Sequence, residues 1–222
     1  MSIQAVVFDL DGTLSNTLDS IAGFANEALV TCGQPAIETE VYKLLIGGGR
    51  DSLIRRMLRH IHGQVDDTLY EKVGAVYDRL YAADPMRDVT VYPGIFELLQ
   101  ALRERDIPCA VLSNKPDDMT RAVAAGLFPA DAFAVVQGQR ADIPKKPAPD
   151  GVYAVLAPMG IAPANCLYVG DTGSDMVTAK NAGAVAAGVL WGFRGEEELR
   201  RDGADVIAAD PQELLEFIDA NR

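Results

Sequence analysis

The chain has 222 residues, 49% of them hydrophobic, and a formal net charge of −12 at pH 7. This length is enough for one large folded domain, or for a core domain with a smaller companion. The acidic charge argues against nucleic acid as a partner, because that affinity depends on Lys and Arg neutralising phosphates. No run reaches the roughly 20 apolar residues that a membrane helix needs, so no membrane partner is expected.

The first predicted element is a short buried strand at residues 5–10. Its run Ala5-Val6-Val7-Phe8 is continuous and apolar, as in a strand covered on both faces. Asp9 and Asp11 follow at once, and Gly12 then allows a sharp turn. Two carboxylates this close repel each other, and burial increases that cost. A bound cation would offset the repulsion.

Residues 17–88 contain helical patterns and no convincing strand. Apolar side chains recur at helical spacing in 18–31, 51–61 and 67–82. The pattern predicts an all-helical insert that forms a small bundle beside the sheet.

From residue 89 onward, strand and helix patterns alternate along the chain. Strands are predicted at 109–112, 133–136, 166–169 and 185–190. Helices are predicted between them at 94–105, 117–125, 149–158 and 174–182, the last with Ser174 as its N-cap and its end before Gly183. The alternation indicates a parallel sheet with helices on both faces. We therefore predict an α/β, doubly wound, Rossmann-like core (1–16 and 89–222) carrying a helical cap (17–88).

Polar side chains follow the predicted strands at the edge where ligands of parallel sheets bind. Besides the first two aspartates, this edge receives Ser113-Asn114-Lys115, Lys145-Lys146-Pro147 and the segment 170–175, which contains Asp171 and Asp175. Oxygen ligands without His or Cys favour Mg²⁺. A magnesium ion beside a lysine makes a site for phosphate, where one carboxylate can act as nucleophile and another as acid and base.

Four segments resemble the motifs of the haloacid dehalogenase-like hydrolases, in the family's order. They are "DLDGTL" at 9–14, "SN" at 113–114, "KP" at 146–147 and "GDTGSD" at 170–175. The helical insert after the first motif resembles the cap of the subclass that contains phosphoglycolate phosphatase. "VYPGIFELLQAL" and "KPAPD" are similar to that group as well.

The resemblance implies a role for each matching residue. Asp9 corresponds to the nucleophile and a metal ligand, and Asp11 to the general acid and base, whose backbone carbonyl would also bind the metal. Ser113 corresponds to the phosphate-binding hydroxyl, with Asn114 beside it. Lys146 corresponds to the lysine that stabilises charge on the phosphoryl group, with Lys145 as a minor rival.

The same resemblance assigns the remaining first-motif and fourth-motif residues. Asp171 corresponds to a direct metal ligand, and Asp175 would hold metal-bound water or Lys146. Thr13 shapes the loop and contacts substrate phosphate. Relatives often carry an acid and a serine after the first motif, whereas this chain has Asn16 and Thr17. That departure concerns contacts at the cap hinge.

The cap segment "IGGGRDSL" (46–53) has two interpretations. In the first, the glycine loop faces the core site, Gly48 approaches substrate closely, and Arg50 binds a substrate carboxylate through two hydrogen bonds. In the second, the segment is a helix–helix turn with a solvated arginine. Similarly, residues 191–194 either wall the site or occupy the core or rim.

The motifs predict a Mg²⁺-dependent phosphatase that acts on a small phosphomonoester such as phosphoglycolate through an aspartyl-phosphate. Halide displacement is disfavoured, because it leaves Asp11 no proton to transfer. Phosphonate cleavage would need a cap lysine in an apolar pocket, and neither Lys43 nor Lys72 has one. A phosphomutase and a pyrophosphatase stay open. A non-catalytic scaffold is disfavoured, because every motif residue is present.

The predicted partner is a small phosphorylated metabolite, and nothing in the sequence specifies an oligomeric state. Cys32, Cys109 and Cys166 are far apart and lack metal-ligand spacing, which fits a reduced compartment. The N-terminus has no signal-peptide pattern. A cytoplasmic location is therefore expected.

Overall fold

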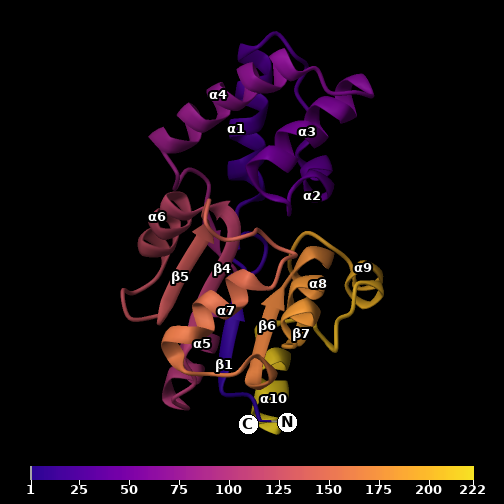
Figure 1. Cartoon of the computed structure of the whole chain (residues 1–222). Helices are drawn as coiled ribbons and strands as arrows, with labels where there is room; N and C mark the ends of the chain where they lie inside the picture. The colour runs from indigo at the N-terminus through magenta and orange to yellow at the C-terminus, as the bar shows by residue number, and fades with distance from the viewer. Residues whose placement is uncertain (1) are drawn as a thin grey trace.

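The computed structural model describes residues 2–222 and consists of a helical part above an α/β part (Figure 1). The two ends of the described chain lie together at the end remote from the helical part, where the Ile3 N–H donates to the Asn221 carbonyl. Within the described residues, no helix has both the length and the apolar character of a membrane span.

A six-stranded parallel sheet forms the centre of the α/β part, in the order β5-β4-β1-β6-β7-β8. The chain adds strands on one side of β1 and then returns to add the others on its opposite side. A crevice opens where the order reverses, at the carboxyl ends of the strands. The strands are β1 (Ala5–Phe8), β4 (Cys109–Pro116), β5 (Val135–Gln139), β6 (Cys166–Gly170), β7 (Val185–Val189) and β8 (Val206–Ala208).

Helices cover both faces of this sheet, because its central strands are buried on both sides. In β1, Val6 and Phe8 belong to one apolar cluster and Ala5 and Val7 to the other. The first cluster includes side chains of α5 (Ile95–Glu104), α6 (Asp117–Leu127) and α10 (Pro211–Ala220). The second includes side chains of α7 (Asp150–Leu156), α8 (Gly173–Ala182) and α9 (Glu196–Arg201). The predicted doubly wound α/β fold is confirmed.

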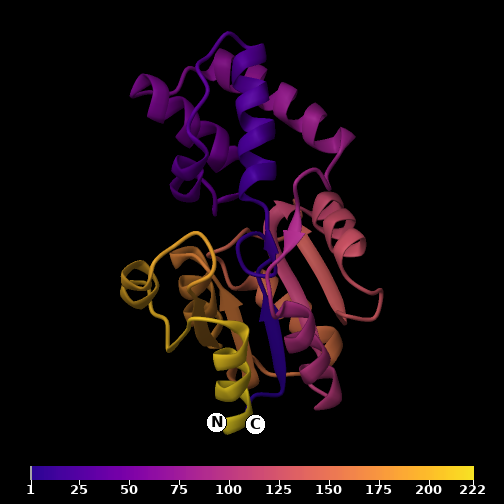
Figure 2. The same ribbon diagram turned by 180° about the vertical axis from the view of Figure 1, so that it is seen from behind.

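The helical part packs around an apolar cluster of its own. A two-residue antiparallel ribbon connects it to the sheet, formed by β2 (Ser15–Asn16) and β3 (Thr90–Val91). Figure 2 shows these two chain segments running side by side below the helices. The helices are α1 (Leu18–Thr31), α2 (Tyr42–Leu45), α3 (Gly49–His62) and α4 (Asp67–Ala83), with 3₁₀ turns at Thr39–Val41 here and at Ala157–Met159 and Pro163–Asn165 in the core. We call α1 to α4 the cap.

Several local predictions were wrong in detail, among them the strand expected at 109–112, which runs to Pro116. The first strand ends at Phe8, because the Leu10 N–H turns to the Asp9 carboxylate at 2.8 Å. The strand expected from residue 133 begins at Val135. Helix α8 has Thr172 as its N-cap instead of Ser174, because the Asp175 carboxylate accepts the Thr172 N–H at 3.1 Å. Its end before Gly183 is confirmed, where φ is +75°.

Candidate active site

Three buried carboxylates meet at the carboxyl ends of two neighbouring strands. Asp9 follows β1, whereas Asp171 and Asp175 follow β6, and the pairing of Phe8 with Val169 sets these strand ends level. One oxygen of each carboxylate lies within 4.8 Å of the others. Asp171 and Asp175 are completely buried, and Asp9 is 7% exposed. The parallel register therefore produces the convergence that the motifs predicted for these three residues.

The loop after β1 closes over Asp171 because two glycines leave room for it. Gly12 has a φ of +89°, and a Cβ atom on Gly12 would collide with the Asp171 carboxylate. A Cβ atom on Gly192 would collide with the Gly12 carbonyl and with Asp171. Thr13 donates its hydroxyl to Asp171 Oδ1 at 3.0 Å. In this structure Thr13 thus holds a carboxylate that belongs to the acidic cluster.

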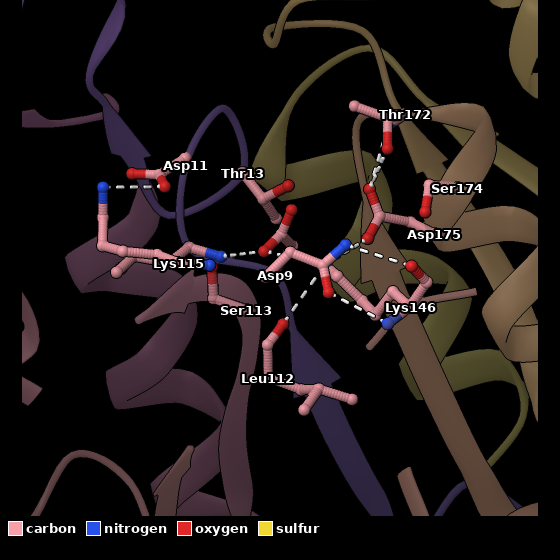
Figure 3. Close-up of polar contacts among 12 residues, drawn as sticks. Asp9, Asp11, Thr13, Leu112, Ser113, Lys115, Lys146, Thr172, Ser174 and Asp175 are labelled. Atoms are coloured by element: carbon pink, nitrogen blue, oxygen red, sulfur yellow. Dashed lines mark hydrogen bonds and ion pairs between the residues drawn. The ribbon is translucent and has the colours of Figure 1, made fainter. Parts of the chain in front are cut away.

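Lys146 provides the positive charge within the acidic cluster (Figure 3). Its Nζ lies 2.9 Å from Asp9 Oδ1 and 2.7 Å from Asp175 Oδ1. Burial alone would lower the pKa of Lys146, but the charges of Asp175 and Asp9 outweigh it and raise the pKa well above its usual value. The lysine is therefore a fixed cation between two acids, as a phosphate-binding site requires.

One lysine does not balance three buried acids. Burial raises the pKa of Asp9 to about 7, with Lys146 opposing the rise and Asp175 adding to it. Burial, together with Asp175 and Asp9, also raises the pKa of Asp171 well above its usual value. A divalent cation would remove this repulsion, and carboxylate oxygens suit it. The cluster of Asp9, Asp171 and Asp175 can thus hold a metal.

Asp175 and Asp171 accept hydrogen bonds from the protein at both of their oxygens, whereas Asp9 does so at one. In Asp175, Oδ1 accepts from Lys146, and Oδ2 accepts from the backbone N–H and the hydroxyl of Thr172 at 3.1 and 2.6 Å. In Asp9, the Leu10 N–H and Lys146 both contact Oδ1. The Oδ2 atom of Asp9 is therefore the oxygen left for phosphorus or for a metal.

Asp11 lies apart from the acidic cluster, beside a lysine that the sequence did not assign. Its Oδ2 is 3.0 Å from Lys115 Nζ, and the same ammonium donates to the Tyr81 hydroxyl on α4 at 2.7 Å (Figure 3 shows the Asp11 pair). Asp11 Oδ1 is buried and has no hydrogen-bond partner among residues 2–222. The signal available in the sequence was the position of Lys115 directly after Ser113-Asn114.

The end of β4 supplies two more of the predicted residues. Ser113 is 4% exposed, and its Oγ accepts the Lys115 N–H at 3.2 Å. Asn114 Oδ1 accepts the Lys146 N–H at 2.9 Å, and its Nδ2 donates to the Lys146 carbonyl at 3.2 Å. Asn114 therefore fixes the backbone that carries Lys146, in addition to facing the cavity described next.

A cavity of about 320 Å³ separates this edge of the sheet from the cap. We call it the interdomain cavity. Its core wall includes Asp9, Asp11, Ser113, Asn114 and Lys146, and its cap wall includes Gly47, Gly49 and Arg50. Thr13, Asp171 and Asp175 lie beneath it, outside its lining.

Gly48 and Arg50, the cap residues predicted to meet the substrate, contact other residues of the protein. The Gly48 carbonyl lies 3.5 Å from Lys145 Nζ. Arg50 donates from Nε and Nη2 to the two oxygens of Asp78 at 2.9 and 2.7 Å, and from Nη1 to Asp51 at 3.0 Å. To bind a substrate carboxylate, the Arg50 guanidinium would have to give up its hydrogen bonds to Asp78. Recognition by Gly48 and Arg50 stays a prediction.

Residues 191–194 do not line the interdomain cavity, and the side chains of Trp191 and Phe193 pack in the apolar clusters, which favours the core or rim interpretation. Trp191 Nε1 donates to the Thr13 carbonyl at 2.9 Å, and the Phe193 N–H donates to Asp171 Oδ2 at 2.9 Å. Arg194 Nη2 reaches across to the cap and donates to the Ile46 carbonyl at 2.9 Å. No motif or pattern in the sequence predicted this last contact.

Comparisons with known proteins agree with the fold and with the motifs. Residues 3–183 match the family model of the haloacid dehalogenase-like hydrolases. The chain is 30% identical over 217 residues to a phosphoglycolate phosphatase of Pectobacterium atrosepticum, covering 98% of this chain and 93% of that protein. It is 33% identical over 198 residues to a phosphoglycolate phosphatase of Rhodospirillum rubrum, covering 87% and 82%.

A solved structure from Lactobacillus delbrueckii subsp. bulgaricus superposes with a TM-score of 0.92 at 29% identity, covering 98% of this chain and 99% of that one. The family model spans well over half of the sequence and includes all four motifs. The chain belongs to the haloacid dehalogenase-like hydrolases.

Proposed function

We propose that this enzyme hydrolyses a small phosphomonoester in a Mg²⁺-dependent reaction that passes through an aspartyl-phosphate on Asp9. Phosphoglycolate is the reference member of this substrate class, because the two curated relatives described above are named for it. The observation that carries the proposal is the position of Asp9. Lys146 contacts Asp9 at Oδ1, Oδ2 is left for the substrate, and the residue lines the interdomain cavity.

In the first half-reaction, Asp9 Oδ2 attacks phosphorus and the phosphorus–oxygen bond to the alcohol breaks. Asp11, two residues along the same loop, gives a proton to the departing alkoxide. Lys146 and the Ser113 hydroxyl stabilise the charge on the transferring phosphoryl oxygens. A bound Mg²⁺ would supply further charge neutralisation at the cluster of Asp9, Asp171 and Asp175.

In the second half-reaction, water attacks the phosphorus of the aspartyl-phosphate. Asp11 now takes a proton from that water, and the acyl phosphate bond breaks to release phosphate and regenerate Asp9. The two steps together consume one water and leave the enzyme unchanged. The cap over the cavity would exclude water during the first step and admit it for the second.

The test is phosphate release from a panel that contains phosphoglycolate, an aryl phosphate, sugar phosphates and pyrophosphate, with Mg²⁺ and with a chelator. We expect Mg²⁺-dependent release from monoesters. Borohydride added during turnover should convert residue 9 to homoserine, which mass spectrometry of the peptide detects. Absence of both metal-dependent release and modified Asp9 would refute the proposal. Sugar-phosphate interconversion without release would instead indicate a mutase, and selective pyrophosphate cleavage a pyrophosphatase.

A further inference from the structure

The interdomain cavity is larger than a two-carbon leaving group requires. Its volume of about 320 Å³ lies at the lower end of the range of roughly 300–1,000 Å³ that holds drug-sized ligands. The phosphate would occupy only the corner formed by Asp9, Ser113 and Lys146. The rest of the space is therefore available to the alcohol half of the substrate.

Apolar side chains from both parts of the molecule line this remaining space. Ile21 on α1, Ile46 before α3 and Leu53 on α3 come from the cap, and each is less than one-tenth exposed. Met119 on α6 comes from the core and packs against the cap's apolar cluster. A purely polar ligand would leave this wall in contact with water, whereas a ligand with hydrocarbon would cover it.

An aromatic side chain adds a polar group to the same wall. Tyr77 on α4 is 7% exposed, and its ring stacks on Tyr81 with centroids 5.7 Å apart. The Tyr81 hydroxyl is taken by Lys115. Tyr77 lines the cavity as well, and its hydroxyl can donate to or accept from a ligand oxygen. Few polar groups on a mainly apolar wall are typical of a ligand site.

We propose that the substrate of this enzyme is a phosphomonoester whose alcohol carries an apolar carbon skeleton larger than that of glycolate. The hydrocarbon lies against the apolar wall of Ile21, Ile46, Leu53 and Met119. This inference rests on the proposed phosphatase function and names the class of leaving group that the site selects.

The test is kcat/KM for methyl, ethyl, n-propyl and n-butyl phosphate at saturating Mg²⁺. These esters differ only in hydrocarbon, so charge and phosphate contacts stay constant. We expect kcat/KM to rise by about twofold to fourfold for each added methylene, the upper value corresponding to about 0.8 kcal/mol of buried CH₂. The same assay with phosphoglycolate allows the kcat/KM for its two-carbon leaving group to be compared with the values for the four alkyl esters.

Two substitutions of Met119 test whether the apolar wall contacts the hydrocarbon of the substrate. Met119→Gln keeps the length of the side chain and makes it polar, so butyl phosphate should lose several-fold more kcat/KM than methyl phosphate. Met119→Leu should keep the rise along the series. Met159→Gln is the control, because Met159 is also partly buried but packs on the far face of the sheet, away from the cavity.

The outcomes separate this inference from the function on which it rests. If no ester is hydrolysed in a metal-dependent way, the proposed function fails, and this inference fails with it. If the esters are hydrolysed but kcat/KM is flat or falls with chain length, the phosphatase function stands and the inference about the leaving group is overturned. Equal losses in Met119→Gln and Met159→Gln would also overturn it.

Discussion

The ammonium of Lys146 lies 2.9 Å from Asp9 Oδ1, and the two side chains are 4% and 9% exposed. Even so, the pKa of Asp9 is raised to about 7, because burial and the neighbouring acids outweigh the attraction of the lysine. The metal-free native state therefore holds a proton on Asp9 that the unfolded chain releases near its ordinary value of 3.8. As pH rises through this window, the native state loses stability relative to the unfolded chain.

Asp9→Asn should remove the part of this pH-dependent loss of stability that comes from Asp9, since the amide is uncharged at every pH. In chelator, we expect the variant and the parent protein to have similar Tm near pH 4.5. At pH 8 the free energy of unfolding of the variant should exceed that of the parent by at least about 1 kcal/mol. This difference is equivalent to about 2–4 °C in Tm for a chain of this size. Thermal denaturation across pH 4.5–8 measures the difference. Added Mg²⁺ should raise the Tm of the parent more than that of the variant, because the variant lacks one ligand.

Asp67→Asn is the matched control for this series. Its side chain on α4 is 88% exposed, so its Tm difference from the parent should stay constant over the same pH range. A difference between Asp9→Asn and the parent that does not change with pH would contradict the assignment of the titrating group.

The same Asp9→Asn substitution should abolish turnover of every phosphomonoester, because an amide oxygen is too weak a nucleophile to replace the carboxylate. We expect kcat to fall by at least roughly 1,000-fold, with the circular dichroism spectrum unchanged. Steady-state kinetics on an aryl phosphate measure the loss. A kcat similar to that of the parent would show that another group attacks phosphorus.

Much of this site was predictable because it depends on strand ends. Asp9 and Asp171 follow continuous apolar runs that form strands. A parallel sheet brings the carboxyl ends of its strands to one edge, and this does not depend on how the surface helices pack. The register between β1 and β6 then placed Asp9, Asp171 and Asp175 together. The prediction needed only the strand pattern and the motif order.

The contacts between core and cap were not predictable in this way. Lys115 meets Tyr81, and Arg194 meets the Ile46 carbonyl, only because the cap packs at one particular angle on the sheet. No local periodicity encodes that angle. The ribbon of β2 and β3 was missed for a different reason: strands of two residues are too short for an alternating pattern.

Lys115 should stabilise the fold through Asp11, because both side chains are largely buried and 3.0 Å apart. Lys115→Met would leave the Asp11 carboxylate buried without its counter-ion, so we expect a loss of about 2–4 kcal/mol in the free energy of unfolding. Asp11→Asn in the same chain should restore part of it, giving a non-additive double-mutant cycle. Urea denaturation of the four proteins measures the coupling.

Lys180→Met provides the comparison, since Lys180 and Asp205 form an ion pair in which both side chains are over one-third exposed. It should cost less than about 1 kcal/mol. Strictly additive effects of Lys115→Met and Asp11→Asn would show that the pair does not act as a unit.

Arg194 should position the cap loop that lines the interdomain cavity. Its side chain is only 8% exposed, and its guanidinium contacts Glu198 at 3.2 Å and donates to the Leu44 and Ile46 carbonyls at 3.4 and 2.9 Å. Because Glu198 also accepts the Gly173 N–H at 3.2 Å, the arginine links the cap loop to the start of α8. Without it, the carbonyls at the end of α2 lose a charged donor from the core.

Arg194→Ala should therefore raise KM about tenfold while lowering kcat much less, with Arg194→Lys recovering part of the loss. Hydrogen exchange should speed up at the amides of residues 46–49 and stay unchanged in α10. Arg200→Ala is the control, because Arg200 pairs with Glu196 on the surface, with side chains 58% and 50% exposed. Since Arg194 does not line the cavity, a loss confined to kcat, with unchanged exchange in the loop, would argue against positioning and place its effect on the chemical step.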